Sequence, residues 1–250
     1  MMTPDQACAI LGTLMVNVDW STLNFQALQE NVIKNAKEAG RQFTTFLKMG
    51  AKMLPNPPES CQTSTQAMEC IYDAIGLGDQ YCQASKKFDL AEVSGFWKVL
   101  MVNGLTYAKI VEAYGHFGVK LGTFGVDLST AIQLKEEQRD PNRDGTYAIK
   151  FRQNVEADPD NANQSYRDRR SAKCQDITAL ERLLLGLVVF LVTRQHLDLE
   201  TWTLTSSLGV GGDVVVVSFD PSNGEAYVFC WDQGSAYPDV RARSAELSSS

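Results

Sequence analysis

The sequence has no surplus of basic side chains. Lys and Arg number 23 against 30 Asp and Glu, which gives a net charge of −7 with neutral histidines. The one short basic cluster holds Arg167, Arg169 and Arg170, and Asp168 interrupts it. A protein that binds nucleic acid needs a basic face to neutralise phosphates. We therefore expect no nucleic-acid partner.

Long apolar runs are also missing. The strongest one, residues 183–192, lies between charged Glu181 and Arg194 and falls short of the roughly 20 residues that a membrane helix needs. Residues 1–20 contain Asp5 and Asp19 and no basic stretch of the kind that opens a secretory leader. We therefore predict no membrane span and a cytoplasmic location. The run itself is typical of a buried helix.

Patterns that bind metals are scarce. No C-x-x-C pair occurs, and His116 and His196 are far apart in the sequence, so a zinc site has no support. The stretch that starts at Asp140 begins like a calcium loop, but its twelfth position is Phe151 instead of an acid. We expect no metal and no cofactor. The cysteines, which we expect to be reduced, are Cys8, Cys61, Cys70, Cys82, Cys174 and Cys230.

The first half of the sequence has helical periodicity. Apolar residues recur at spacings of three and four between residues 25 and 46, which predicts an amphipathic helix. Further helices are predicted over residues 63–74, 90–102 and 107–114. Residues 135–145 (KEEQRDPNRDG) are polar and turn-forming and predict a linker. We therefore predict a helical domain over residues 1–140 and a second domain over residues 141–250.

The second half combines strands with one helix. Alternating apolar residues from 147 to 155 predict a strand. Thr178 and Glu181 form a capping box that opens an apolar helix over residues 179–193. Three short strands are predicted over residues 201–205, 214–219 and 226–231, with a tight turn at residues 220–224. This pattern predicts an α+β fold in which a helix packs on small antiparallel sheets.

The last of these strands has an aromatic face. Tyr227, Phe229 and Trp231 alternate along it, and polar and aromatic residues follow in the segment 235–239. Aromatic side chains among Ser and Asp are typical of an adaptable binding surface. The same alternation also fits an aromatic core, and the pattern leaves both interpretations open.

Several stretches resemble a known family. They are residues 145–152 (GTYAIKFR), 177–185 (ITALERLLL), 193–198 (TRQHLD) and 240–243 (VRAR), with 96–98 (FWK) and 114–118 (YGHFG) in the first half. They resemble the variable proteins of diversity-generating retroelements, in the form found in candidate-phylum bacteria. The resemblance covers most of residues 95–243. Residues 205–212 (TSSLGVGG) depart from the family's pattern, which leaves the alignment of residues 206–213 open.

The resemblance implies a fold and a surface. The second half would be a C-type-lectin-like domain of the formylglycine-generating-enzyme type, with the helix 179–193 and Trp202 in its core. In this family a retroelement rewrites codons for solvent-facing residues that bind ligands. The matching variable positions are Ser218, Asp220, Tyr227, Phe229, Asp232, Ser235, Tyr237 and Asp239. The fixed framework positions would be Val228, Trp231, Val240 and Arg241.

The function implied by the resemblance is that of a display protein, not an enzyme. It would bind a protein or another macromolecular ligand, without a cofactor, and it could form oligomers. Two alternatives remain open. One is an oxidoreductase related to the formylglycine-generating enzymes, which would use Cys174 and Cys230 together. The other is an adaptor whose helical half docks a partner.

Overall fold

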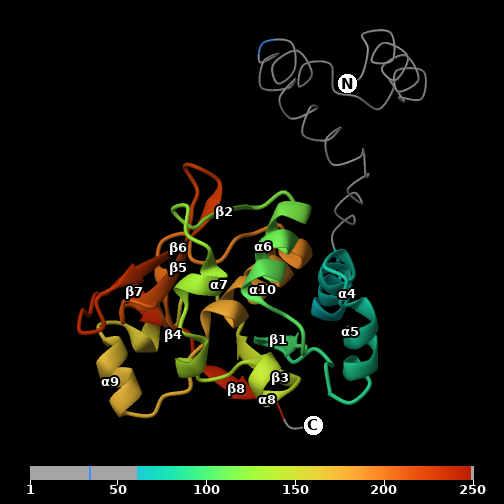
Figure 1. Cartoon of the computed structure of the whole chain (residues 1–250), viewed down its shortest axis with the longest axis horizontal. Coiled ribbons are helices and arrows are strands. Elements are labelled where there is room, and N and C mark those ends of the chain that lie inside the picture. The colour runs from blue at the N-terminus through green and yellow to red at the C-terminus, as the bar shows by residue number, and fades with distance from the viewer. Residues whose placement is uncertain (1–33, 35–60, 249–250) are drawn as a thin grey trace. The chain divides into compact units, whose positions relative to one another are not determined.

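The computed structural model of the chain describes residue 34 and residues 61–248. Residues 61–248 belong to one compact unit, which extends over Leu54–Ser250. They form an α+β fold with two sheets, as the sequence predicts (Figure 1). The amphipathic helix expected between residues 25 and 46 lies outside the described residues. Within residues 61–248, every helix is too short or too polar to cross a membrane.

The helix α10, Ala179–Thr193, is the centre of the unit and confirms the helix expected there. Thr178 accepts a hydrogen bond from the Glu181 backbone, and the Glu181 carboxylate accepts one from the Thr178 backbone, so the predicted capping box is present. The helix ends at Arg194, which adopts a left-handed conformation. Its side chains are buried on nearly every side, which explains why the run is apolar all round.

A three-stranded antiparallel sheet crosses the expected domain boundary. Its strands lie in the order β1 (Phe96–Met101), β3 (Tyr147–Arg152) and β8 (Ala245–Leu247). In the register of β1 and β3, Trp97 lies opposite Phe151. The boundary near residue 140 therefore falls inside one compact unit, because strands from before and after it pair directly.

The helix expected over residues 90–102 is wrong, since β1 occupies that stretch. Five of its six residues, from Trp97 to Met101, are buried, so both faces of the strand are covered. A strand buried on both sides is a continuous apolar run, and such a run cannot be distinguished from a buried helix by periodicity. The helices α4 (Ser64–Ala74) and α10 pack against it.

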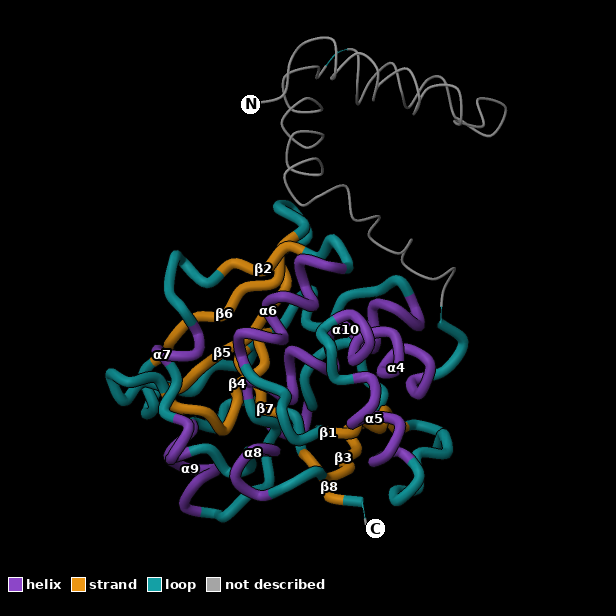
Figure 2. Tube along the Cα trace, turned by 45° about the vertical axis from the view of Figure 1, so that its right-hand side comes forward, coloured by secondary structure: helices purple, strands orange, loops and turns teal. Residues whose placement is uncertain are grey.

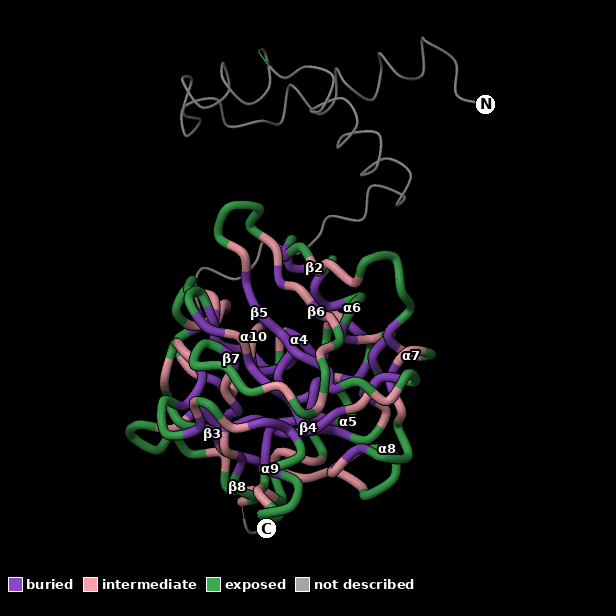
Figure 3. Tube along the Cα trace, turned by 90° about the vertical axis from the view of Figure 1, so that its left-hand side faces the viewer, coloured by how far each residue is buried: buried purple, intermediate pink, exposed green. Residues whose placement is uncertain are grey.

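The second sheet has five strands in the order β2, β6, β5, β4 and β7. Their bounds are β2 Lys120–Gly122, β4 Trp202–Leu208, β5 Val214–Asp220, β6 Glu225–Trp231 and β7 Val240–Ala242. The strands β4, β5 and β6 confirm the expected meander, and β2 and β7 add parallel edges. Figure 2 shows α6, α10 and α4 gathered on one side of this sheet, and Figure 3 shows β4 and β5 mainly buried.

Shorter elements complete the unit. They are α5 Gly78–Ser85, α6 Tyr107–His116, α7 Leu128–Ala131, η3 Leu134–Glu136, α8 Pro141–Asp144, η4 Pro159–Asn161 and α9 Tyr166–Ser171. The helices α4 and α6 confirm those expected over residues 63–74 and 107–114.

The stretch 135–145 is not a linker, although its composition predicts one. Glu137 and Arg139 are buried within it. Arg139 donates to Glu181 of α10 from Nε at 2.8 Å and from Nη2 at 2.9 Å. Two of the charged side chains that make the stretch look solvated, Glu137 and Arg139, thus have partners inside the protein, and Asp140 caps α8.

Candidate ligand-binding site

The five-stranded sheet has two chemically different faces. Its inner face, towards α10, is formed by side chains of the main core such as Val215, Val217 and Val228. Its outer face carries a smaller apolar cluster, which includes Val214 and Val216. Successive side chains of a strand point to opposite faces, and this alternation separates the two sets. Phe229 lies opposite Val216 in the register, so β6 directs its aromatic residues outwards.

A row of aromatic rings crosses the outer face. Trp202 contacts Phe229 and Trp231 edge to face, at centroid distances of 5.1 and 5.4 Å. Trp231 contacts Tyr237 in the same way at 5.7 Å. All of these side chains except Tyr237 are half-buried, and Tyr237 is exposed. Edge-to-face arrangements are among the favoured geometries of aromatic pairs and stabilise the relative orientation of these rings.

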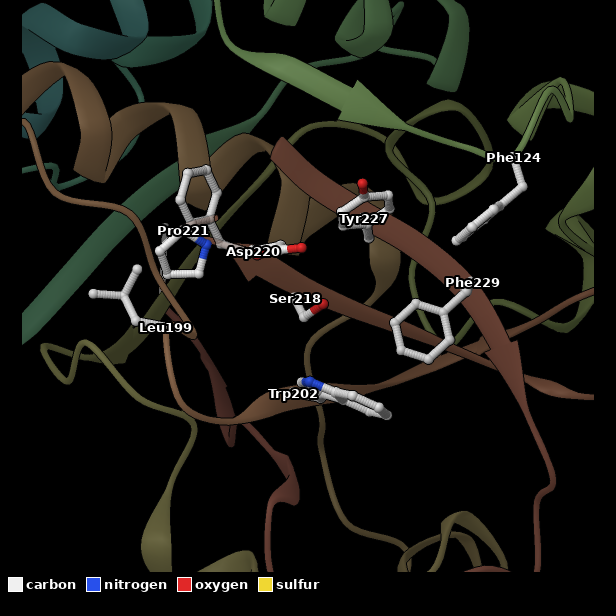
Figure 4. Close-up of a pocket in the computed structure, with 9 residues that line it drawn as sticks. Phe124, Leu199, Trp202, Ser218, Asp220, Pro221, Tyr227 and Phe229 are labelled. Atoms are coloured by element: carbon white, nitrogen blue, oxygen red, sulfur yellow. The ribbon is translucent and has the colours of Figure 1, made fainter. Parts of the chain in front are cut away.

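A cavity of about 520 Å³ opens at one end of this row (Figure 4). Its lining is mostly apolar and aromatic, and comes from β4, β5, β6 and three connecting segments. The lining residues are Phe124, Leu199, Trp202, Ser218, Phe219, Asp220, Pro221, Tyr227 and Phe229. This volume and this mixture of rings with a few polar groups are typical of small-molecule or side-chain pockets.

Phe124 forms the outer rim of the cavity from the loop between β2 and α7. Its ring stacks on Tyr227 at a centroid distance of 5.6 Å, and 72% of its surface is exposed. Its φ of 52° lies in the left-handed region, which aromatic residues rarely adopt. A strained backbone with an exposed aromatic side chain is typical of a binding loop.

Tyr227 owes its position to Gly122 in the neighbouring strand. A Cβ atom at Gly122 would lie 2.6 Å from the Tyr227 ring. The two residues are opposite each other where β2 pairs with β6. Glycine at this position therefore allows the ring to lie across β2 and to form one wall of the cavity.

Asp220 brings a negative charge to the cavity. Its Oδ1 accepts hydrogen bonds from the Ser222 hydroxyl at 2.6 Å and the Ser222 backbone at 2.8 Å, and its Oδ2 accepts one from Asn223 at 2.8 Å. These donors, the Ser222 hydroxyl first, lower the pKa of Asp220. The side chain is therefore ionised at neutral pH. Asn223 also donates to the Tyr227 hydroxyl at 3.2 Å.

Half of the expected variable positions line this cavity. Ser218, Asp220, Tyr227 and Phe229 belong to its walls. The Ser218 side chain is buried, with 7% exposure, whereas the resemblance implies a solvent-facing residue there. Its neighbour across the sheet is Tyr227 of β6, which also lines the cavity.

The other expected positions lie in the segment 232–239 that follows β6. Asp232 accepts hydrogen bonds from the Gly234 backbone at 2.8 Å and from the Ser235 hydroxyl at 3.3 Å. Asp232, Tyr237 and Asp239 are exposed, and Ser235 is half-buried. Tyr237 reaches back to Trp231 and so connects this segment with the aromatic row.

Some lining residues are missing from the sequence-based set. Trp202 was expected in the core, but it is half-buried and forms part of the cavity wall. Its outward direction follows from the parity of β4, since Thr203 next to it points inwards and is fully buried. Phe124, Leu199 and Pro221 come from loops, where no periodicity exists to indicate their direction.

The cysteines Cys174 and Cys230 are free thiols in different surroundings. Cys230 lies on β6 beside Gly209, and Cys174 follows α9, where its carbonyl accepts a hydrogen bond from Gln138. The structure brings together a different pair, Cys61 and Cys70, whose Sγ atoms are 4.0 Å apart. Among residues 61–248, no three His, Cys, Asp or Glu side chains are grouped to hold a metal ion.

Comparisons of the chain with protein-family models, with curated proteins and with solved structures find no match.

Proposed function

We propose that this chain is a ligand-binding display protein, as its resemblance to the variable proteins of diversity-generating retroelements implies. In this proposal residues 141–250 supply most of a C-type-lectin-like fold within the compact unit, and the outer face of the five-stranded sheet is the diversified surface. The ligand is a protein or another macromolecule, and the protein binds it in the cytoplasm.

One observation carries the proposal. Positions selected from the resemblance and from strand alternation gather at one place on the fold. Ser218, Asp220, Tyr227 and Phe229 line a single cavity, and the remaining positions follow in the adjoining segment 232–239. Residues chosen without regard to ligand binding would be divided between both faces of the strands and the core.

The architecture also suits a surface that changes. The side chains of the inner face are packed against α10, whereas most of the proposed variable side chains reach solvent. Exchanges of exposed side chains usually alter stability by only about 0.5 kcal/mol. The strands can therefore keep their fold while their outer residues vary.

Sequencing the 3′ end of the gene across a natural population of its source tests this proposal. We expect variation concentrated in the codons for Tyr227, Phe229 and Tyr237, with constant codons for the inward residues Val217 and Val228. The inward residues are the matched control, because they belong to the same strands. Variation spread evenly over inward and outward codons, or no variation at all, would contradict a diversified surface.

A further inference from the structure

The walls of the cavity favour a positively charged ligand group. Phe124 and Tyr227 present stacked rings on one side, and Trp202 and Phe229 present rings at 89° to each other on the other. Figure 4 shows the rings of Tyr227, Phe229 and Trp202 arranged around the cavity with Asp220 and Ser218 between them. The face of an aromatic ring carries a negative quadrupole, which attracts a guanidinium or ammonium group.

The charges around the cavity have the matching sign. Asp220 is the only ionised side chain in its lining, and no Lys or Arg of residues 61–248 belongs to that lining. Lys120 is a basic residue on the outer face nearby, and it lies in register with Glu225 at the edge of the sheet. An anionic ligand would meet Asp220 and the ring faces without a compensating cation.

A neutral polar ligand fits the cavity less well. Ser218 and Asp220 supply its polar side chains, and the Asp220 oxygens already accept three hydrogen bonds from Ser222 and Asn223. A sugar needs several free donors and acceptors, whereas a delocalised cation needs ring faces and one nearby carboxylate. The volume of about 520 Å³ accommodates a guanidinium together with its aliphatic stem.

We infer that this cavity binds an organic cation, presented as an arginine or lysine side chain of a protein partner. The inference rests on the proposed function, because it names the ligand chemistry of the same site. In the bound state the cation lies among the rings of Trp202, Tyr227 and Phe229, in the same cavity as the Asp220 carboxylate. The aliphatic stem contacts Leu199 and Pro221.

The test compares two isosteric probes on the whole chain. N-acetyl-L-arginine amide and the neutral N-acetyl-L-citrulline amide are titrated, and tryptophan fluorescence reports binding. We expect the arginine probe to bind about tenfold more tightly, in keeping with a desolvated cation–ring contact. Equal affinities for the two probes, or no binding of the arginine probe, would overturn the inference.

Two matched variants locate the effect. Asp220→Asn removes the charge at the cavity, and we expect about tenfold weaker binding of arginine with unchanged binding of citrulline. Asp213→Asn removes an exposed charge just before the opposite end of β5, and we expect no change. An equal loss in both variants would mean that only the net charge of the protein matters, and that result also contradicts the cavity as the site.

A selection from a random peptide library separates this inference from the proposed function. The library is enriched on the whole chain and, in parallel, on a Phe229→Ser variant. Enrichment of Arg and Lys that Phe229→Ser abolishes supports the inference. Enriched peptides without basic residues, also lost on the variant, would overturn the cation but retain a ligand-binding site. Enrichment that is the same on both proteins would contradict both proposals.

Discussion

The two faces of the five-stranded sheet are built from the same strands but have different roles. One face packs against the core, and the other lines a cavity. On the inner face Val215, Val217 and Val228 pack against the core around α10. On the outer face Phe229 contacts Trp202 edge to face and Tyr227 stacks on Phe124, and all four rings line a cavity. The difference teaches that strand parity alone can separate residues that hold the fold from residues that are free to bind.

The largest effect on stability is expected from a substitution at Asp198, a buried aspartate on the inner side of the sheet that is paired with buried arginines. The fully buried carboxylate accepts hydrogen bonds from Arg182, Arg243 and Thr203. Burial alone would raise the pKa of Asp198, but Arg243 and Arg182 outweigh it and lower the pKa. Asp198→Asn leaves two guanidinium groups buried without their anion, and we expect a loss of about 3–5 kcal/mol in the free energy of unfolding.

Urea unfolding measures this loss, and Asp239→Asn is the control. Asp239 is an exposed aspartate of the segment 232–239, and its replacement should change stability by no more than about 0.5 kcal/mol. Similar losses in both variants would break the comparison, because the outer acids would then be as structural as the inner one.

A second effect depends on pH and concerns Glu137, which lies beneath the N-terminus of α10. Its carboxylate accepts hydrogen bonds from the Tyr107 hydroxyl and from the Ser207 hydroxyl of β4, each at 2.9 Å. Burial is the main cause that raises the pKa of Glu137 from 4.5 to about 7. The folded protein therefore keeps a proton that the unfolded chain releases at lower pH.

The direction of the pH effect follows from this raised pKa. Between pH 4.5 and about 7 the folded state binds more protons at Glu137 than the unfolded state, so its contribution to stability falls as the pH rises. The contribution of Glu137 to the free energy of unfolding falls by about 3 kcal/mol in total, and the fall ends above pH 7. Glu137→Gln should remove this fall, and the exposed neighbour Glu136→Gln should retain it, in urea titrations at pH 5 and pH 8. If the loss of stability between pH 5 and pH 8 persisted in Glu137→Gln, another titratable group would be its cause.

Much of the fold could be predicted because its signals are local. The capping box at Thr178 and Glu181, and the turn at residues 220–224, depend on neighbours in sequence. The strand β1 and the pairing of Arg139 with Glu181 could not be predicted, because both depend on partners that are distant in the chain. An apolar run has no period once both its faces are buried, and a charged segment appears solvated until its counter-charge is known.

The cavity was partly predictable for the same reason. Strand alternation and the resemblance together indicated Tyr227 and Phe229, which line it. The alternation along β4 also indicated the outward direction of Trp202, but the resemblance implied a core residue there. Phe124 had no local signal, since its contribution depends on a loop that brings its ring to Tyr227.

The smallest effect on stability is expected in a pair of substitutions to serine, one in the segment 232–239 after β6 and one on the inner face of β5. Tyr237→Ser removes an exposed ring with one edge contact to Trp231, and we expect a loss of at most about 1 kcal/mol. Val217→Ser places a hydroxyl in the core that α10 covers, and its loss should be clearly larger, because a buried hydroxyl without a partner costs about 1–3 kcal/mol in addition to the lost packing. Thermal unfolding of the two variants measures both losses of stability and so compares them. If Tyr237→Ser proved as destabilising as Val217→Ser, the outer residues would belong to the structural core, and a surface that varies without loss of the fold could not be built on them.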